Sequence, residues 1–253
     1  LQDTQGNGRT IREHKVALSD ELSAAIRAYA KQHEVSPAAI FHAAWALVLG
    51  ACSNQQEVVF GTVMSGRMNG GAGVERLLGM LINTLPVAVP LQGASVADFI
   101  IEVDRRLKAL LPYEQVSLAQ AQKYSAVGSD GPLFSAMLNY RHTELGETDS
   151  DAQESDIQAL GAQERTNYPF NLSVNDYGAA HVFSLDLQID EQVEISRIAD
   201  YVMTALSTLT DAAHTQPVHA LSVLPADEVT RLLTQGQQSL SYDNTACIHQ
   251  LFE

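Results

Sequence analysis

Apolar residues recur every three or four positions along much of the chain, which is the spacing that buries one face of an α-helix. Residues 16–50 follow this helical pattern, and we divide them into two predicted helices. Ser19 is placed to cap the first, which should end near residues 33–35, and Ser36 with Pro37 begins the second. Further helices are predicted over residues 95–111, 117–124, 194–214 and 226–234.

Shorter runs that are apolar or alternate with polar residues predict β-strands. They cover residues 57–64, 78–89, 134–140, 170–175 and 182–188, with an additional edge strand at residues 157–164. The alternation in residues 170–175 predicts one exposed face that can pair, and Asp176-Tyr177-Gly178 predicts a hairpin turn after it. Because strands and helices alternate, the predicted fold class is α/β, with a mixed β-sheet flanked by helices.

Two polar residues, Asn83 and Thr84, interrupt a strand run that is otherwise apolar on both sides. A strand buried on both faces normally stays apolar, so these two side chains need hydrogen-bond partners or a cavity. The pattern leaves two interpretations open: the side chains satisfy backbone groups of a loop, or they line a channel.

Composition and charge limit the classes of protein to which this chain can belong. The chain has 253 residues, 45% of them hydrophobic, which suits one large or two modest domains. Its 15 basic and 30 acidic residues give a formal net charge of −15, which argues against a nucleic-acid or anionic-membrane surface. Residues 144–156 hold six of the acidic residues and predict a solvated loop.

Several further features concern the cellular location of the chain and its place in a longer polypeptide. No apolar run approaches the roughly 20 residues that span a bilayer, and the first residues do not resemble a signal peptide. The chain lacks an initiator Met, so we expect it to begin inside a longer, cytoplasmic polypeptide. Cys52 and Cys247 lie far apart without metal-ligand spacing, and Cys52 is expected in the core.

The candidate chemistry is sparse. His42 lies among alanines of a predicted helix, which favours a packed or surface residue over a catalyst. His142 stands at a strand end without an identifiable partner and is a poor candidate base. Ser65-Gly66-Arg67 follows a strand, and the arginine either ties loops together through carbonyl groups or contacts a substrate.

Short motifs occur in a fixed order along the chain. They are V-V-F-G-T-V-M-S-G-R (58–67), L-G-M-L-I-N-T-L-P-V (78–87), Y-E-Q-V-S-L (113–118), R-T-N-Y-P (165–169) and I-H-Q-L-F-E (248–253). The first four, together with Arg12-Glu13-His14 and A-A-W-A-L-V-L (43–49), are collinear within residues 12–220 and resemble the C-terminal lobe of the condensation domains of nonribosomal peptide synthetases. The third departs from that family's H-x-x-x-P pattern, with Tyr113 in place of His and Ser117 in place of Pro. The fifth resembles the start of an adenylation domain.

This resemblance implies a chloramphenicol-acetyltransferase-like lobe, one of two that form a V with a channel between them. A donor acyl group and an acceptor amine then arrive on phosphopantetheine arms of carrier proteins, and no cofactor is bound directly. The family's catalytic histidine belongs to an H-H-x-x-x-D-G motif on the N-terminal lobe. None of the eight histidines here is part of such a motif, so the chain is expected to be inactive alone.

The resemblance also implies boundaries, partners and site residues. Residues 1–220 would form the lobe, 221–245 the linker and 246–253 the start of an adenylation domain. The expected partners are the N-terminal lobe, the upstream and downstream peptidyl carrier proteins and the adenylation domain, with no nucleic acid, membrane or metal. No catalytic residue is assigned, and the channel candidates are Ser65, Gly66, Arg67, Asn83, Thr84, Asn139, Arg141, Thr166, Asn167 and Ser173.

Two other functions remain open. An epimerisation domain shares the fold, although the N-T-L-P sequence and the adenylation-like segment that follows favour condensation. A non-catalytic docking or scaffold module for carrier proteins or the adenylation domain is compatible with the missing histidine motif.

Overall fold

A computed structural model describes residues 10–68, 73, 78–92, 94–125, 127, 131–143, 166–211, 213 and 215–237. The chain divides into two compact units, Leu1–Val223 and Leu224–Glu253. The predicted acidic loop (144–156), edge strand (157–164) and adenylation-like segment (248–253) lie outside the described residues.

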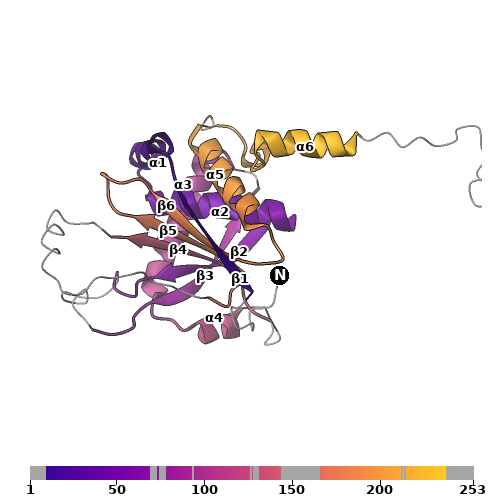
Figure 1. Cartoon of the computed structure of the whole chain (residues 1–253). Coiled ribbons are helices and arrows are strands. Elements are labelled where there is room, and N and C mark those ends of the chain that lie inside the picture. The colour runs from indigo at the N-terminus through magenta and orange to yellow at the C-terminus, as the bar shows by residue number, and fades with distance from the viewer. Residues whose placement is uncertain are drawn as a thin grey trace, which may run out of the picture. The chain divides into compact units, whose positions relative to one another are not determined.

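The first unit is built on a six-stranded mixed sheet with the strand order β1-β6-β5-β4-β2-β3 (Figure 1). Strands β2, β4 and β5 are parallel to one another, whereas β3, β6 and β1 pair antiparallel with their neighbours. The carboxyl ends of β2, β4 and β5 therefore meet at one end of the sheet. The strands are β1 (Ile11–Ala17), β2 (Glu57–Met64), β3 (Asn83–Pro90), β4 (Ala136–His142), β5 (Phe170–Asp176) and β6 (Ser184–Asp190).

Four helices cover one face of this sheet, and a short fifth helix, α4, lies on the other side next to β3 (Figure 1). The covering helices are α1 (Asp20–Gln32), α2 (Pro37–Ser53), α3 (Val96–Leu110) and α5 (Ile195–Asp211); α4 is Leu118–Tyr124. The described part of this unit also contains two short 3₁₀ helices, η2 (Leu111–Tyr113) and η4 (Val218–Ala220), and the second unit contains α6 (Ala226–Gly236). The predicted α/β class with a mixed sheet and flanking helices is confirmed.

Local sequence explains where the first two helices begin. The hydroxyl groups of Ser19 and Ser36 accept hydrogen bonds from the backbone N–H of Leu22 and Ala39, each at 3.2 Å, as the capping pattern predicts. Helix α2 is buried almost all round, and Trp45 is fully buried in it. Among the described helices, none alone has the length and hydropathy to cross a bilayer; only α1 and α2 together do, across a 111° bend.

Two predictions about strands are wrong. Val16 and Ala17 belong to β1 rather than to a helix, because residues 11–17 pair with β6 along their whole length. All seven residues of β5 are buried, although one face was expected to be exposed. This strand lies between β4 and β6, so side chains of both neighbours surround its polar residues.

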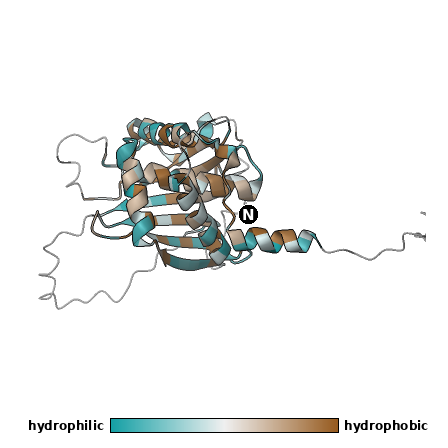
Figure 2. Cartoon of the chain, turned by 90° about the horizontal axis from the view of Figure 1, so that it is seen from above, coloured by the Kyte–Doolittle hydropathy of each residue, from teal (hydrophilic) through white to brown (hydrophobic). Residues whose placement is uncertain are grey.

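Two further expectations are corrected near β3 and α2. Strand β3 begins at Asn83, not at residue 78, and only alternate residues, from Leu85 to Val89, are buried, because successive side chains of a strand point to opposite faces of the sheet. Figure 2 shows this alternation of hydrophobic and hydrophilic residues along the strands. Cys52 is exposed, since the last turn of α2 extends past its buried stretch, which ends at Gly50.

Candidate functional site

The sheet face opposite the four covering helices carries polar side chains on its central strands. Thr62 of β2 faces the helices, because its hydroxyl bonds to His42 of α2, so the neighbouring Gly61 faces away. The strand register aligns Gly61 with a row of side chains on β4, β5 and β6. Two further rows on the same face join Asn139 with Ser173 and Asp186, and Arg141 with Asn175 and Ser184. We call the polar residues of these three rows the polar sheet face: Asn139, Arg141, Asn171, Ser173, Asn175, Ser184, Asp186 and Gln188.

Hydrogen bonds across the strands order this polar sheet face. The guanidinium Nη2 of Arg141 donates to Ser173 Oγ at 2.8 Å. The amide of Asn175 donates to Ser184 Oγ at 3.1 Å and to Asp186 Oδ2 at 3.3 Å. The face thus offers fixed amide, hydroxyl and guanidinium groups for hydrogen bonding, and it unites three of the sequence candidates: Asn139, Arg141 and Ser173.

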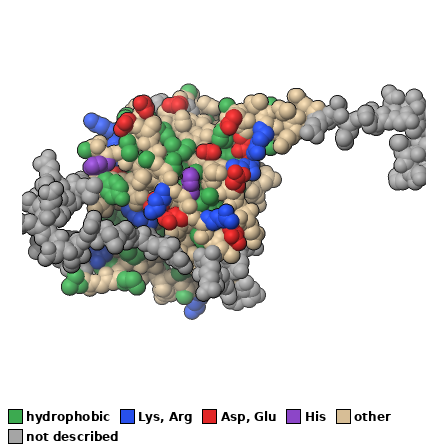
Figure 3. All heavy atoms as spheres, viewed as in Figure 1, with side chains coloured by type: hydrophobic (Ala, Val, Ile, Leu, Met, Phe, Trp, Pro, Cys, Tyr) green, Lys and Arg blue, Asp and Glu red, His purple; other side chains and the backbone are tan. Residues whose placement is uncertain are grey.

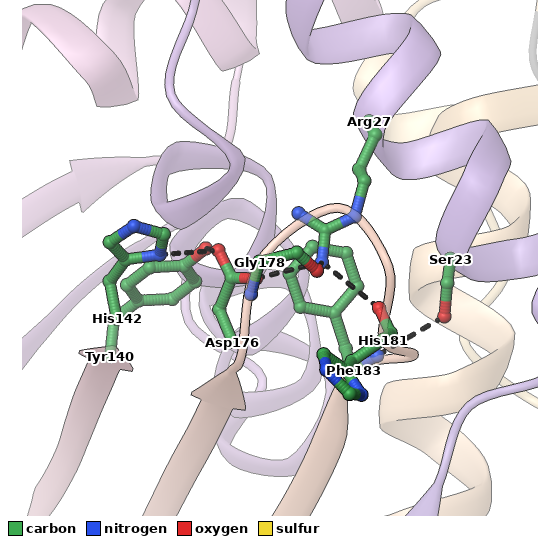
Figure 4. A network of polar contacts seen from close by, with 8 residues as sticks. All are labelled: Ser23, Arg27, Tyr140, His142, Asp176, Gly178, His181 and Phe183. Carbon is green, nitrogen blue, oxygen red and sulfur yellow. Dashed lines mark hydrogen bonds and ion pairs between the residues drawn. The ribbon is translucent and has the colours of Figure 1, made fainter. Parts of the chain in front are cut away.

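On the opposite face, Asp176 gathers polar side chains at the carboxyl end of β5 (Figure 4). Its Oδ1 accepts from Arg27 Nη2 of α1 at 2.7 Å and from the backbone N–H of Gly178 at 3.1 Å. Its Oδ2 accepts from Tyr140 OH at 2.7 Å and from His142 Nδ1 at 3.0 Å. Burial alone would raise the pKa of Asp176, but these hydrogen bonds outweigh it and lower the pKa to about 2.

The Asp176 network also closes the turn between β5 and β6 against α1. Arg27 donates to the carbonyl oxygens of Gly178 and His181 at 2.8 and 3.2 Å, and its guanidinium lies 4.0 Å from the ring centre of Phe183. The network fixes Tyr140 and His142 on the helix side of β4. Arg141 lies between them in the strand, so its side chain is directed to the polar sheet face.

A second group of candidates forms a brace between three loops at the carboxyl end of β2. Gly66 has φ of +70°, and a Cβ there would lie 1.9 Å from the carbonyl oxygen of Leu81, so a side chain does not fit. Its own carbonyl oxygen accepts from Gln115 Nε2 at 2.7 Å. Arg67 Nη2 lies 3.4 Å from the carbonyl oxygen of Gly79, which corresponds to the loop-tying interpretation.

Asn83 completes this brace. Its amide nitrogen donates to the carbonyl oxygens of Glu114 and Val116 at 3.0 and 2.6 Å, and its Oδ1 accepts from the N–H of Thr84 at 2.9 Å. Asn83 therefore satisfies backbone groups of a loop, one of the two interpretations of the polar pair. Ser65 Oγ accepts a hydrogen bond from the backbone N–H of Arg67 at 3.2 Å. We call residues Ser65, Gly66, Arg67, Asn83 and Gln115 the loop brace.

Thr84 and the remaining candidates lie elsewhere. Thr84 faces away from the helices and lies next to Gly61. If Gly61 carried a Cβ, that atom would lie 2.8 Å from the methyl carbon of Thr84. Thr166 and Asn167 precede β5 and so lie at the opposite end of the sheet from the loop brace. Thr166 Oγ1 accepts from the backbone N–H of Tyr168 at 3.1 Å. The ten candidates thus occupy four places rather than one.

The two histidines singled out in the sequence make structural contacts. His42 is buried; its Nδ1 donates to the carbonyl oxygen of Ala38 at 2.7 Å, and its Nε2 accepts from Thr62 Oγ1 at 2.8 Å. Burial lowers the pKa of His42 to about 4, so the ring is neutral near pH 7. His142 has the partner in Asp176 that the sequence did not reveal.

Sequence reasoning missed Arg27 and Asp176, together with every member of the polar sheet face on β5 and β6 except Ser173. The signal for those on β5 was the alternation along residues 170–175, which was interpreted as an exposed face. Within the described residues, no cluster of three His, Cys, Asp or Glu side chains is arranged to hold a metal ion. Figure 3 shows Lys, Arg, Asp and Glu side chains interspersed over one face of the molecule.

Comparison with known sequences identifies close relatives. Malpibaldin synthetase of Mortierella alpina is 39% identical over all of this chain, and a linear gramicidin synthase protein from Brevibacillus parabrevis is 30% identical over 97% of it. The chain spans only 5% of the length of each of these synthetases.

Solved structures share the fold at low sequence identity. The condensation domain of the monacolin K polyketide synthase MokA superposes with a TM-score of 0.70 at 15% identity, over 85% of this chain and 50% of that domain. The X-domain from teicoplanin biosynthesis, solved in complex with OxyB, gives a TM-score of 0.71 at 14% identity, over 90% of this chain and 51% of that one.

The family profile described as "Condensation domain" matches residues 2–233, which is most of the chain. Together with the identity to two peptide synthetases, this match agrees with the motif order and with the six-stranded sheet. The chain belongs to the condensation-domain family of nonribosomal peptide synthetases.

Proposed function

We propose that this chain is the C-terminal half of a condensation domain that forms amide bonds between an acyl or peptidyl donor and an aminoacyl acceptor, both bound to carrier proteins. The observation that carries the proposal is the extent of the match. The family profile covers residues 2–233, yet the chain spans about half of a solved condensation domain and contains no H-H-x-x-x-D-G motif.

The polar sheet face supports a role as one wall of the substrate channel. Pantetheine arms and peptidyl groups contain amides, which require both donors and acceptors along their path. The guanidinium of Arg141 and the amide of Asn139, both half-buried on β4, supply such groups, and they lie beside the buried amides of Asn171 and Asn175 on β5. The catalytic histidine would come from the other half of the domain, because none of the eight histidines of this chain belongs to an H-H-x-x-x-D-G motif.

The partners follow from this proposal. They are the N-terminal half of the domain, the upstream and downstream peptidyl carrier proteins and the adjacent adenylation domain. Substrates would arrive on phosphopantetheine arms, and the chain itself would hold no cofactor.

Reconstitution tests this function. The chain is fused behind the segment of malpibaldin synthetase that directly precedes its 39% identical part and supplied with a panel of aminoacyl-pantetheine thioesters. Mass spectrometry should detect dipeptidyl-pantetheine with the fusion and none with the chain alone. The control fusion carries alanine at the second histidine of the supplied half's H-H-x-x-x-D-G motif. Turnover by this chain alone, or equal turnover by the control fusion, would refute the proposal.

A non-catalytic docking module is the second candidate. It is favoured by the similarity in fold to the X-domain, which was solved in complex with another protein, OxyB, and of which this chain also covers about half. If the fusion binds carrier proteins but forms no dipeptidyl product, this second function is supported instead.

A further inference from the structure

Asp186 of β6 is a half-buried carboxylate on the polar sheet face. Its Oδ2 accepts one long hydrogen bond, from the amide of Asn175 at 3.3 Å, and within the described residues no Lys, Arg or His side chain forms an ion pair with it. Lys15, its direct neighbour on β1, instead lies 3.4 Å from Glu13. Since a carboxylate loses solvation when it is partly buried, the folded chain alone gains little from having one at this position.

The opposite face of the sheet shows how this chain pairs charges that serve stability. There Arg27 and Asp176 form an ion pair at 2.7 Å, and further hydrogen bonds satisfy both oxygens of that carboxylate. On the polar sheet face, the guanidinium of Arg141 donates to Ser173, which pairs with Asp186 across the strands, and not to Asp186 itself. The carboxylate of Asp186 thus remains available to a ligand.

A second acceptor without a partner lies next to Asp186. Asn171 of β5 is only 6% exposed, and no donor reaches its buried carbonyl oxygen Oδ1. The register of β5 with β6 makes Asn171 and Asp186 diagonal neighbours on one face, so their Cα atoms lie about 7–8 Å apart. Buried amides in native proteins almost always have partners, so an exception calls for a functional explanation.

We propose that Asp186 and Asn171 form a binding site for a cationic side chain of the substrate, such as that of a lysyl or ornithyl residue. This inference rests on the proposed function, in which the polar sheet face is a wall of the substrate channel. Two unfilled oxygen acceptors, one of them charged, are complementary to an ammonium group, which combines several N–H donors with a positive charge. Asp186 supplies the charge at the accessible side of the site, and Asn171 accepts a hydrogen bond at its deeper end.

The α-amino group of the acceptor can also be an ammonium, but it fits this site less well. It must be unprotonated to attack the thioester, and a carboxylate in contact with it would raise its pKa and favour the unreactive form. A side-chain ammonium takes no part in the reaction, so it can keep its charge throughout. The site therefore acts on the choice of substrate.

Matched substrates test the inference with the fusion described above. In the donor arm, N-acetyl-lysyl- or N-acetyl-norleucyl-pantetheine is combined with a glycyl acceptor; in the acceptor arm, lysyl- or norleucyl-pantetheine is combined with an N-acetylglycyl donor. Norleucine lacks only the ammonium group, so the ratio of kcat/KM for the two substrates isolates its contribution. The unchanged fusion should prefer the lysyl substrate at least about tenfold in one arm, because hydrogen bonds between charged groups are strong in a partly buried site.

Variants of Asp186 separate selection from a general effect on folding. Asp186→Asn should reduce the lysyl preference at least about tenfold, whereas Asp186→Glu should retain most of it. A misfolded fraction lowers kcat/KM for both substrates equally, so it leaves their ratio unchanged. The matched control is Asp200→Asn, which removes an exposed carboxylate from α5 on the other side of the sheet and should keep the full preference.

Asn171→Leu tests the second member of the site by two measurements. Because leucine is of similar size and removes an unsatisfied buried amide, the urea midpoint should not fall, while the lysyl preference should decrease. A lower midpoint would show that Asn171 has partners within the folded chain, and an unchanged preference would show that it does not contact the cation. Either result overturns the two-residue site.

The remaining outcomes distinguish the inference from the proposed function. Dipeptide formation with equal kcat/KM for lysyl and norleucyl substrates in both arms overturns the cation site and leaves the proposed function standing. If Asp186→Asn lowers turnover of glycyl and norleucyl acceptors as strongly as that of the lysyl acceptor, Asp186 binds the α-amino group and the inference is wrong. Absence of dipeptide with every pair of substrates counts against the proposed function itself.

Discussion

The buried pair His42 and Thr62 predicts a specific loss of stability on mild acidification. The double substitution His42→Leu/Thr62→Val replaces both hydrogen-bonding partners between α2 and β2 with apolar side chains of similar size. Removing both partners together leaves neither buried group unsatisfied, so the free energy of unfolding near pH 7.5 should change little. The double variant does, however, lose the imidazole of His42, which is the group that titrates.

The magnitude follows from the two pKa values of His42. The unfolded chain protonates this ring near pH 6.5, whereas in the folded chain burial lowers the pKa to about 4. Between these values the unfolded state binds more protons, so stability is intact above about pH 6.5 and falls as the pH drops toward 4. Integrated from pH 7.5 to pH 5, this single group removes about 2 kcal/mol from the free energy of unfolding.

Urea unfolding followed by circular dichroism at pH 7.5, 6.5, 5.5 and 5.0 measures this loss. The difference in unfolding free energy between pH 7.5 and 5.0 should be about 2 kcal/mol smaller in the double variant than in the unchanged chain. His219→Gln, a change at an exposed histidine, is the control and should keep the full dependence. If the double variant retains the same loss between these pH values, His42 is not the group responsible and the reasoning fails.

Three further substitutions test the contacts that position the candidate site. Asp176→Asn leaves the guanidinium of Arg27 without its ion-pair partner and should lower the unfolding free energy by about 3 kcal/mol in urea titrations; a change below about 1 kcal/mol would contradict the network. Gly61→Ala places a methyl group 2.5 Å from the ring of Phe134 and should cost about 2 kcal/mol, part of which Phe134→Leu should restore, whereas an unchanged melting temperature would refute the close packing. Asn83→Ala removes two donors to loop carbonyl oxygens and should cost about 2 kcal/mol, with faster amide exchange in residues 114–116; unaltered exchange would argue against the loop brace.

Much of the secondary structure was predictable because it depends on local patterns. Ser19 and Ser36 cap α1 and α2 as predicted, since a cap is formed within four residues of chain. The hairpin of β5 and β6 follows from Asp176 and Gly178 for the same reason. Strand β1 was missed because an edge strand of charged residues has no strong pattern of its own and is defined by pairing with β6.

The site was predictable only in part. The sequence predicts Asn139, Arg141 and Ser173 as separate candidates on two strands, but their alignment depends on the parallel pairing of β4 with β5. Arg27 and Asp176 are 149 residues apart, and nothing in either local sequence indicates that they form an ion pair. The exposure of Leu78 and Met80 is equally unpredictable from the sequence, because a run of apolar residues before Asn83 has the pattern of a buried strand.

The sequence by itself determined the family, the α/β class, most helices and the absence of the H-H-x-x-x-D-G motif, because each of these depends on the order of residues along the chain. Only the tertiary structure decided which side chains meet. Strand register places Arg141 beside Ser173, helix packing buries His42, and the loop brace turns Leu78 and Met80 toward solvent. These contacts join residues far apart in sequence, so they depend on how the sheet and helices pack and not on local patterns.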